Sequence, residues 1–182
     1  EDIEMIVKNG IIEGIEYLPS PNFDNRPDES SIDLIVVHAI SLPPKNYDTQ
    51  TIKDFFLNKL KPTKEPFLES IKDIKVSSHF LITRSGALIQ FVPMDKRAWH
   101  AGLSIYKGRK DCNNFSIGIE LEGCDEDVFE SSQYLKLIEL TKIIMNEYNI
   151  SIDNIAGHSD IAPERKTDPG ELFDWKLYLS RL

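Results

Sequence analysis

Two of the four histidines in the sequence lie where short apolar runs give way to polar loops. His38 lies near the end of the run 32–40, IDLIVVHAI, and the loop LPPKNYDTQ begins shortly after it. His158 follows the short run 155–157 and leads into a densely charged segment that contains Asp168. Catalytic zinc commonly takes three His or carboxylate ligands and keeps a fourth position for water, so these three residues could form such a site.

Spacing alone does not select the zinc site. Most histidines lie on the surface or form hydrogen bonds in the core, and this interpretation is favoured at this point because the sequence has no HExxH helix. Nucleophilic sites have weaker support. No serine lies in a G-x-S-x-G turn, neither Cys112 nor Cys124 has the flanking residues of a thiol protease, and no phosphate-binding glycine loop occurs.

Two acidic residues, Glu120 and Glu122, alternate with apolar residues in the segment 115–123, FSIGIELEG. Alternate side chains of a strand point to the same face of a sheet. A solvated edge would explain the pair without any function. Ile117 and Ile119 occupy the opposite face, however, so the pattern directs Glu120 toward the loops where a site would form.

Apolar patterning predicts the elements that must position these residues. Segments 32–40 and 115–123 are predicted strands, and the first should be central because its run is almost continuously apolar. Segment 77–93 predicts a hairpin around the turn Arg84-Ser85-Gly86. A short strand is predicted at 155–157, and helices at 49–60, 131–149 and 173–182.

Length and charge limit the classes of protein and partner. With 182 residues the chain suits one domain, 1–182, that begins with a loop-rich arm, 1–31. A net charge of −9 opposes binding to nucleic acid or to an anionic membrane. The start EDIEMIVKNG carries acids where a secretory signal would carry bases, and the two cysteines form no Cys-x-x-Cys pair, so a reducing, cytoplasmic location is expected.

Four segments together resemble a known enzyme family. VVHAISLPP, SSHFLITRSGALIQFVPMDKRAWHAG, CNNFSIGIELEG and GHSDIAPERKTDPG are similar, in that order, to segments of the cytoplasmic anhydromuramoyl-L-alanine amidases. These belong to the wider zinc amidase family that includes phage amidase lysozymes and peptidoglycan-recognition proteins. The resemblance covers residues 30–175 and implies an α+β fold, in which helices pack against a mixed β-sheet.

The resemblance also implies roles for individual residues. It places one Zn²⁺ per chain on His38, His158 and Asp168, and it makes Glu120 the general base and Lys166 the residue that stabilises the oxyanion. The implied substrate is a small muropeptide from cell-wall recycling. The bond cut joins the lactyl group of an anhydro-N-acetylmuramic acid to the L-alanine of the stem peptide.

Substrate contacts are predicted for the WHAG motif, because the aromatic face of Trp99 and the polar ring of His100 suit a carbohydrate. Burial of Trp99 in the core is an equal alternative. His79 is interpreted as a structural histidine or as a group behind the metal ligands.

The chain departs from the family pattern at three positions associated with sugar and peptide contacts. Ala39 stands where the family has Asn, while Lys75 and Asp111 stand where it has Arg. Two alternatives to the amidase therefore remain open: a non-catalytic module that binds muropeptides, which the complete ligand set opposes, and a general zinc peptidase.

Overall fold

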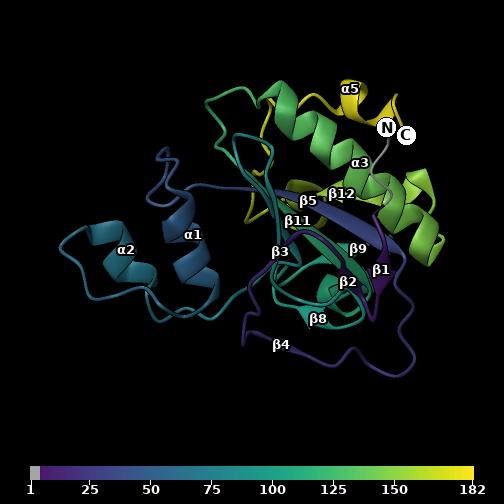
Figure 1. Ribbon diagram of the computed structural model, residues 1–182, viewed down its shortest axis with the longest axis horizontal. Helices are drawn as coiled ribbons and strands as arrows, with labels where there is room; N and C mark the ends of the chain where they lie inside the picture. Colours follow the sequence, from purple (N-terminus) through teal and green to yellow (C-terminus); the bar gives the residue numbers. More distant parts are fainter. Residues whose placement is uncertain (1–4) are drawn as a thin grey trace.

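The computed structural model describes residues 5–182, so the first four residues of the predicted arm lie outside the described part. A six-stranded mixed sheet forms the centre, in the order β12-β5-β11-β6-β7-β3. Neighbouring strands are parallel except for the antiparallel pair β6 and β7. Helices pack against this sheet, which confirms the predicted α+β class (Figure 1).

Five of the six strands follow the predicted pattern closely, and β3 lies in the segment predicted as a loop-rich arm. In chain order they are β3 (Glu16–Tyr17), β5 (Leu34–Ile40), β6 (Phe80–Ile82), β7 (Leu88–Gln90), β11 (Ser116–Glu122) and β12 (Ile155–Gly157). β5 lies between β12 and β11, as its apolar run predicts. The predicted hairpin is the pair β6 and β7.

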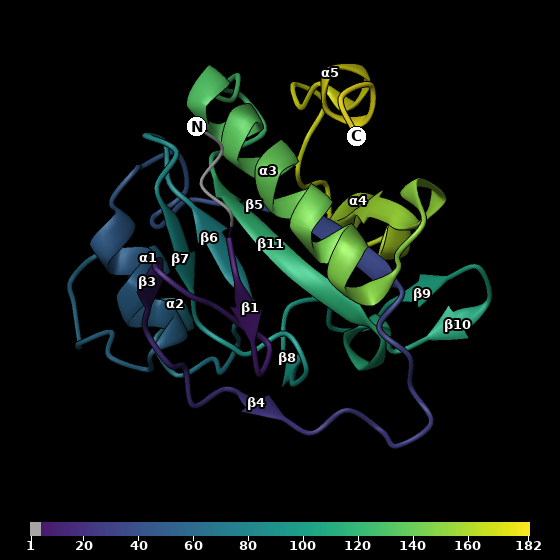
Figure 2. The same cartoon turned by 45° about the vertical axis from the view of Figure 1, so that its right-hand side comes forward.

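Alternate residues of β5 and β11 face two different layers. Ile35 and Val37 of β5, like Ile117 and Ile119 of β11, belong to a core cluster that contains residues of helix α3 (Ser131–Tyr148). Figure 2 shows α3 crossing this face of the sheet, with α5 (Trp175–Leu179) nearby. The intervening residues, which include His38 and Glu120, point to the other face.

The second face of the sheet carries a separate pair of helices. Helix α1 (Thr49–Phe56) packs Ile52 and Phe56 against β7 and the residues after it, whereas α2 (Pro66–Ile71) buries no side chain fully. Both figures show α1 and α2 together at one side of the sheet (Figures 1 and 2). The predicted helix 49–60 ends early because Asn58 adopts a left-handed conformation, with φ of 58°.

The N-terminal arm is more ordered than its loop-rich sequence predicts. Besides β3, it forms β1 (Val7–Lys8), β2 (Ile11–Ile12) and β4 (Phe23–Asp24). β4 pairs with β8 (Arg97–Ala98), while β9 (Ile105–Tyr106) and β10 (Arg109–Lys110) form a further small hairpin. Within residues 5–182, no helix is both long and apolar enough to cross a membrane.

Candidate metal centre

Strand register brings His38 and Glu120 together. His38 of β5 pairs directly with Glu120 of β11, and paired residues of parallel strands point to the same face of the sheet. His38 Nδ1 lies 3.8 Å from Glu120 Oε1, and both side chains are buried. The sheet thus holds a candidate ligand and a candidate base at fixed positions.

His158 and Asp168 reach the same point from the other edge of the sheet. β12 pairs with β5, so His158, which begins helix α4 (His158–Ile161), lies beside His38. The two Nδ1 atoms are 3.0 Å apart. Asp168 lies 3.3 Å from His158 Nδ1 and 3.4 Å from His38 Nδ1, and its Oδ2 accepts the backbone N–H of Ala39 at 3.2 Å.

The side chains of these three residues are close enough together to hold one zinc ion. Bonds of about 2.0–2.1 Å to a tetrahedral zinc ion place neighbouring ligand atoms about 3.3–3.4 Å apart. In this chain the two Nδ1 atoms are 3.0 Å apart, and Asp168 directs a different oxygen to each, with Oδ1 3.3 Å from His158 and Oδ2 3.4 Å from His38. With one ligand atom taken from each residue, the three atoms lie within 4.8 Å of one another. Burial lowers the pKa of His38 to about 4, so its imidazole is neutral and can offer a lone pair at physiological pH.

Asp168 completes the donor set with a negative charge. Burial by itself would raise the pKa of this carboxyl, but hydrogen bonds to His158 and His38 outweigh burial and hold the pKa well below its usual range. Two imidazoles and one carboxylate form a donor set typical of zinc enzymes, so the residues present fit this ion.

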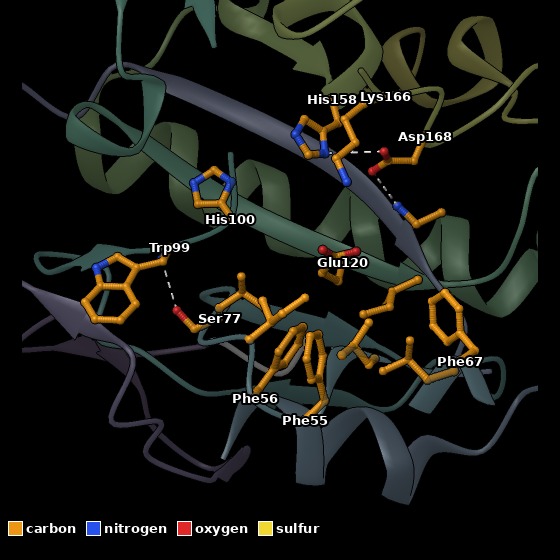
Figure 3. Close-up of a pocket in the computed structure, with 16 residues that line it drawn as sticks. Phe55, Phe56, Phe67, Ser77, Trp99, His100, Glu120, His158, Lys166 and Asp168 are labelled. Carbon is orange, nitrogen blue, oxygen red and sulfur yellow. Dashed lines mark hydrogen bonds and ion pairs between the residues drawn. The ribbon is translucent and has the colours of Figure 1, made fainter. Parts of the chain in front are cut away.

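Glu120 and Lys166 lie next to these ligands (Figure 3). Burial first, and the charge of Asp168 second, raise the pKa of Glu120 well above its usual value, while Lys166 lowers it. Glu120 Oε2 is buried and has no hydrogen-bond partner among the described residues. Lys166 is exposed, and Figure 3 shows its side chain extending between His158 and Asp168 toward the pocket.

A pocket of about 290 Å³ opens on this centre. One wall is polar and contains Glu120, His158, Lys166, Asp168 and His100. The other wall is apolar and is formed by Phe55, Phe56, Phe67, Ile71, Ile74, Val76 and Trp99. Phe67 and Ile74 were not predicted as site residues, because they belong to a segment without an apolar pattern.

The structure brings together all seven residues singled out in the sequence. His158, Asp168, Glu120, Lys166, Trp99 and His100 line the pocket, and His38 contacts His158 and Glu120. Their individual roles remain predictions. Trp99 is half-buried, so its exposure lies between that of a core residue and that of a fully exposed substrate contact. His79 lies behind them, where its Nδ1 accepts the backbone N–H of Gly118 at 3.1 Å, which suits its structural interpretation.

Fold and site together define an α+β protein with a candidate hydrolytic metal centre at one face of a mixed sheet. The model of the protein family N-acetylmuramoyl-L-alanine amidase (Amidase_2) matches residues 28–171. The chain therefore belongs to the N-acetylmuramoyl-L-alanine amidase family, as the four sequence segments predict.

Relatives and solved structures agree with this assignment. The chain is 47% identical over 178 residues to the 1,6-anhydro-N-acetylmuramyl-L-alanine amidase AmpD of Enterobacter cloacae, which covers 98% of this chain and 95% of that protein. The AmpD of Haemophilus influenzae is 47% identical over 96% of this chain and 95% of its own length. A crystal structure of a selenomethionine derivative of AmpD is similar with a TM-score of 0.94 and 44% identity, over 98% of this chain and 99% of that one.

A more distant relative has been solved with a ligand. The amidase AmiD of Escherichia coli, in complex with the substrate anhydro-N-acetylmuramic acid-L-Ala-D-γ-Glu-L-Lys, has a TM-score of 0.63 and 31% identity. The similarity covers 86% of this chain and 60% of the AmiD chain.

Proposed function

We propose that this protein hydrolyses the amide bond between the lactyl group of anhydro-N-acetylmuramic acid and the L-alanine of a stem peptide, in the recycling of peptidoglycan. The names of the AmpD relatives support this reaction at 47% identity over nearly the whole chain. The ligand of the AmiD complex supports a muropeptide as the substrate. A cytoplasmic location is part of the proposal.

The observation that carries the proposal is the convergence of His38, His158 and Asp168 beside a buried glutamate. Their ligand atoms all lie within 4.8 Å of one another, although His38 is far from the other two residues in the sequence. Zn²⁺ held by these atoms would act as a Lewis acid, polarising the amide carbonyl and making water nucleophilic at neutral pH.

Glu120 has the properties of the general base. Its Oε2 is buried and has no hydrogen-bond partner within residues 5–182, so this atom is free to accept a proton from the attacking water. Its raised pKa, caused first by burial, lets the carboxyl hold that proton and then give it to the leaving amine of the L-alanine. Because Glu120 lies on a central strand, its position relative to His38 is fixed before substrate binds.

Lys166 would stabilise the negative charge that develops on the carbonyl oxygen. It comes from the same loop as Asp168 and lines the pocket together with Glu120. An ammonium group near a developing oxyanion lowers the transition-state energy more than that of the uncharged ground state. The apolar wall reduces the access of water to this charge and strengthens the interaction.

Substrate binding would extend from the centre to a neighbouring cavity of about 420 Å³. Trp99 and His100 line both cavities, which supports the contact with the muropeptide predicted for the WHAG motif. The cavity also carries cationic side chains, namely those of Lys75, Arg97, Arg165 and Lys166. Their charge suits the carboxylates of a stem peptide.

The test is an assay of the purified protein with an anhydromuramoyl-tripeptide, followed by mass spectrometry of the products. We expect free anhydro-N-acetylmuramic acid and free tripeptide, loss of turnover after chelation, and recovery on addition of Zn²⁺. His38→Ala should prevent both zinc binding and turnover. Binding of the substrate without cleavage in the zinc-loaded protein would refute the enzyme and favour a binding module. Cleavage of plain peptides alone would favour a general peptidase.

A further inference from the structure

Two consecutive residues hold the outer nitrogens of both histidine ligands. His38 Nε2 lies 2.8 Å from His100 Nδ1, and His158 Nε2 lies 3.0 Å from the backbone carbonyl oxygen of Ala101. The segment 100–101 therefore contacts both imidazoles on the side that faces away from Asp168. Such outer contacts decide which ring nitrogen of a histidine carries its proton.

For His158, the carbonyl oxygen of Ala101 decides which ring nitrogen carries the proton. A carbonyl oxygen can only accept a hydrogen bond, so Nε2 of His158 must carry the proton and donate it to Ala101. In a neutral ring, Nδ1 then carries the lone pair. That atom faces Asp168 and His38, where the candidate metal ion would lie.

For His38, the position of the proton depends on how the ring of His100 is oriented. When Nδ1 of His38 binds a metal ion, Nε2 must carry the proton, and among the described residues its hydrogen-bond partner is Nδ1 of His100. Nδ1 of His100 must then accept, which leaves the proton of that ring on Nε2. Nε2 lies 3.0 Å from the hydroxyl of Ser116, which can accept it.

His100 is fixed in place by its surroundings. Both its backbone N–H and that of Ala101 donate to Asn113 Oδ1, at 3.1 and 2.8 Å. Its ring lies over Gly118, where a Cβ atom would come within 2.5 Å of the ring carbon Cγ. A glycine on strand β11 thus leaves the space that the ring fills. The ring is buried, so its direction is set by the protein and not by solvent.

We propose that His100 is a positioning residue of the metal centre, which accepts the Nε2 proton of His38 and is itself oriented by Ser116. The chain Ser116–His100–His38 presents the Nδ1 lone pair of His38 to the metal ion. This inference rests on the proposed zinc site. It also leaves neither ring nitrogen of His100 for hydrogen bonding to substrate, so any contact with a muropeptide would involve the carbon edge of the ring.

A pair of variants of equal shape tests the proposal. In His100→Asn the side-chain oxygen can replace Nδ1 as the acceptor for His38, whereas His100→Leu has the same shape and no acceptor. Both variants leave the Ser116 hydroxyl without its partner, so that loss is matched. We expect His100→Leu to bind Zn²⁺ about 10- to 100-fold more weakly than the wild type, and His100→Asn to recover most of that loss.

Zinc affinity is measured by competition with a chromophoric chelator, and the stability of each zinc-free variant by unfolding in urea. The visible spectrum of the Co²⁺-loaded protein gives a second readout, since a change in the orientation of His38 alters the ligand field. We expect an altered spectrum for His100→Leu and a nearly unchanged one for His100→Asn. Equal zinc affinities of the two variants, with both folded, would overturn the role of His100.

Two buried serines provide a milder comparison if the His100 variants fail to fold. Ser116→Ala removes the hydroxyl behind His100, whereas Ser78→Ala removes an equally buried hydroxyl that donates to the Gly118 carbonyl at 2.8 Å. We expect a several-fold loss of zinc affinity for Ser116→Ala only. Equal effects of the two variants would contradict the proposal. A wild-type protein that binds no zinc would instead overturn the proposed metal centre, and this inference with it.

Discussion

The buried, uncharged state of His79 makes the stability of the zinc-free protein depend on pH. The side chain has no exposed surface, and its Nε2 lies 2.8 Å from the carbonyl oxygen of Lys96 and 3.3 Å from the guanidinium of Arg26. Burial first, and the positive charge of Arg26 second, lower the pKa of His79 from 6.5 to about 3.

The sign and size of the effect follow from this difference in pKa. The unfolded chain takes up a proton at His79 near pH 6.5, whereas the folded chain does so only near pH 3. The stability that the neutral histidine contributes is therefore complete above pH 6.5 and is lost as the pH falls toward 3. Each pH unit below 6.5 costs about 1.4 kcal/mol, so the loss between pH 7 and pH 5 is about 2 kcal/mol.

His79→Asn isolates this contribution, because the side-chain oxygen of Asn can still accept the N–H of Gly118 and carries no charge at either pH. The free energy of unfolding in urea is measured at pH 7, 6 and 5 with a chelator present, using tryptophan fluorescence. Other titrating groups are common to both proteins, so the wild type should lose about 2 kcal/mol more than the variant between pH 7 and pH 5. Equal losses in the two proteins would refute the reasoning.

Three further substitutions test the centre. Glu120→Gln should reduce turnover about 1000-fold while zinc binding is unchanged, as measured by steady-state kinetics and metal content; unchanged turnover would exclude Glu120 as the base. Lys166→Met should lower kcat about 100-fold, whereas Lys59→Met, at an exposed position, should not change it. Gly118→Ala should displace the His100 ring. We expect it to destabilise the fold by about 1–3 kcal/mol in urea unfolding and to weaken zinc binding in chelator competition. Wild-type values in both measurements would show that the ring can move without cost.

The elements with strong apolar patterns could be predicted from the sequence. Strands β5 and β11 and helix α3 match their predicted segments within one or two residues, because each presents a regular apolar face to the same core. Helix α2 was not predicted, since it buries no residue fully and so carries no apolar period. Strand β3 is only two residues long, and its pairing with β7 involves residues too distant in sequence for a local pattern to indicate.

The candidate site was predicted in composition but not in geometry. The resemblance identified His38, Glu120 and Asp168, and the alternation of β11 directed Glu120 toward the site. The direct pairing of His38 with Glu120 depends on the register of two strands separated by about eighty residues, which no local pattern specifies. For the same reason the contact between His38 and His100 could not be foreseen, and His100 was assigned only to substrate binding.

The three departures from the family pattern have different structural consequences. At Ala39 the backbone N–H donates to Asp168, and this contact does not depend on the side chain. Asp111 lies at an exposed turn with φ of 59°. It lines neither the cavity of about 290 Å³ nor the cavity of about 420 Å³. Its negative charge therefore weakens the positive potential nearby but leaves the walls of both cavities unchanged. Lys75 is different, because it lines the cavity of about 420 Å³ itself.

The two arginines that line the same cavity as Lys75 are already engaged in other contacts. Arg97 is paired with Asp24, and Arg165 donates to the carbonyl oxygens of Ala101 and Leu103. Both guanidinium groups are therefore engaged in holding loops. Under the proposed function, recognition of the stem-peptide carboxylates depends on Lys75, because Lys166 stabilises the oxyanion. The ammonium group of Lys75 acts as a mobile point charge and lacks the planar double contact of arginine. Under this proposal, Lys75 keeps the preference of the cavity for negatively charged groups. It does not impose the geometric selection that an arginine would impose.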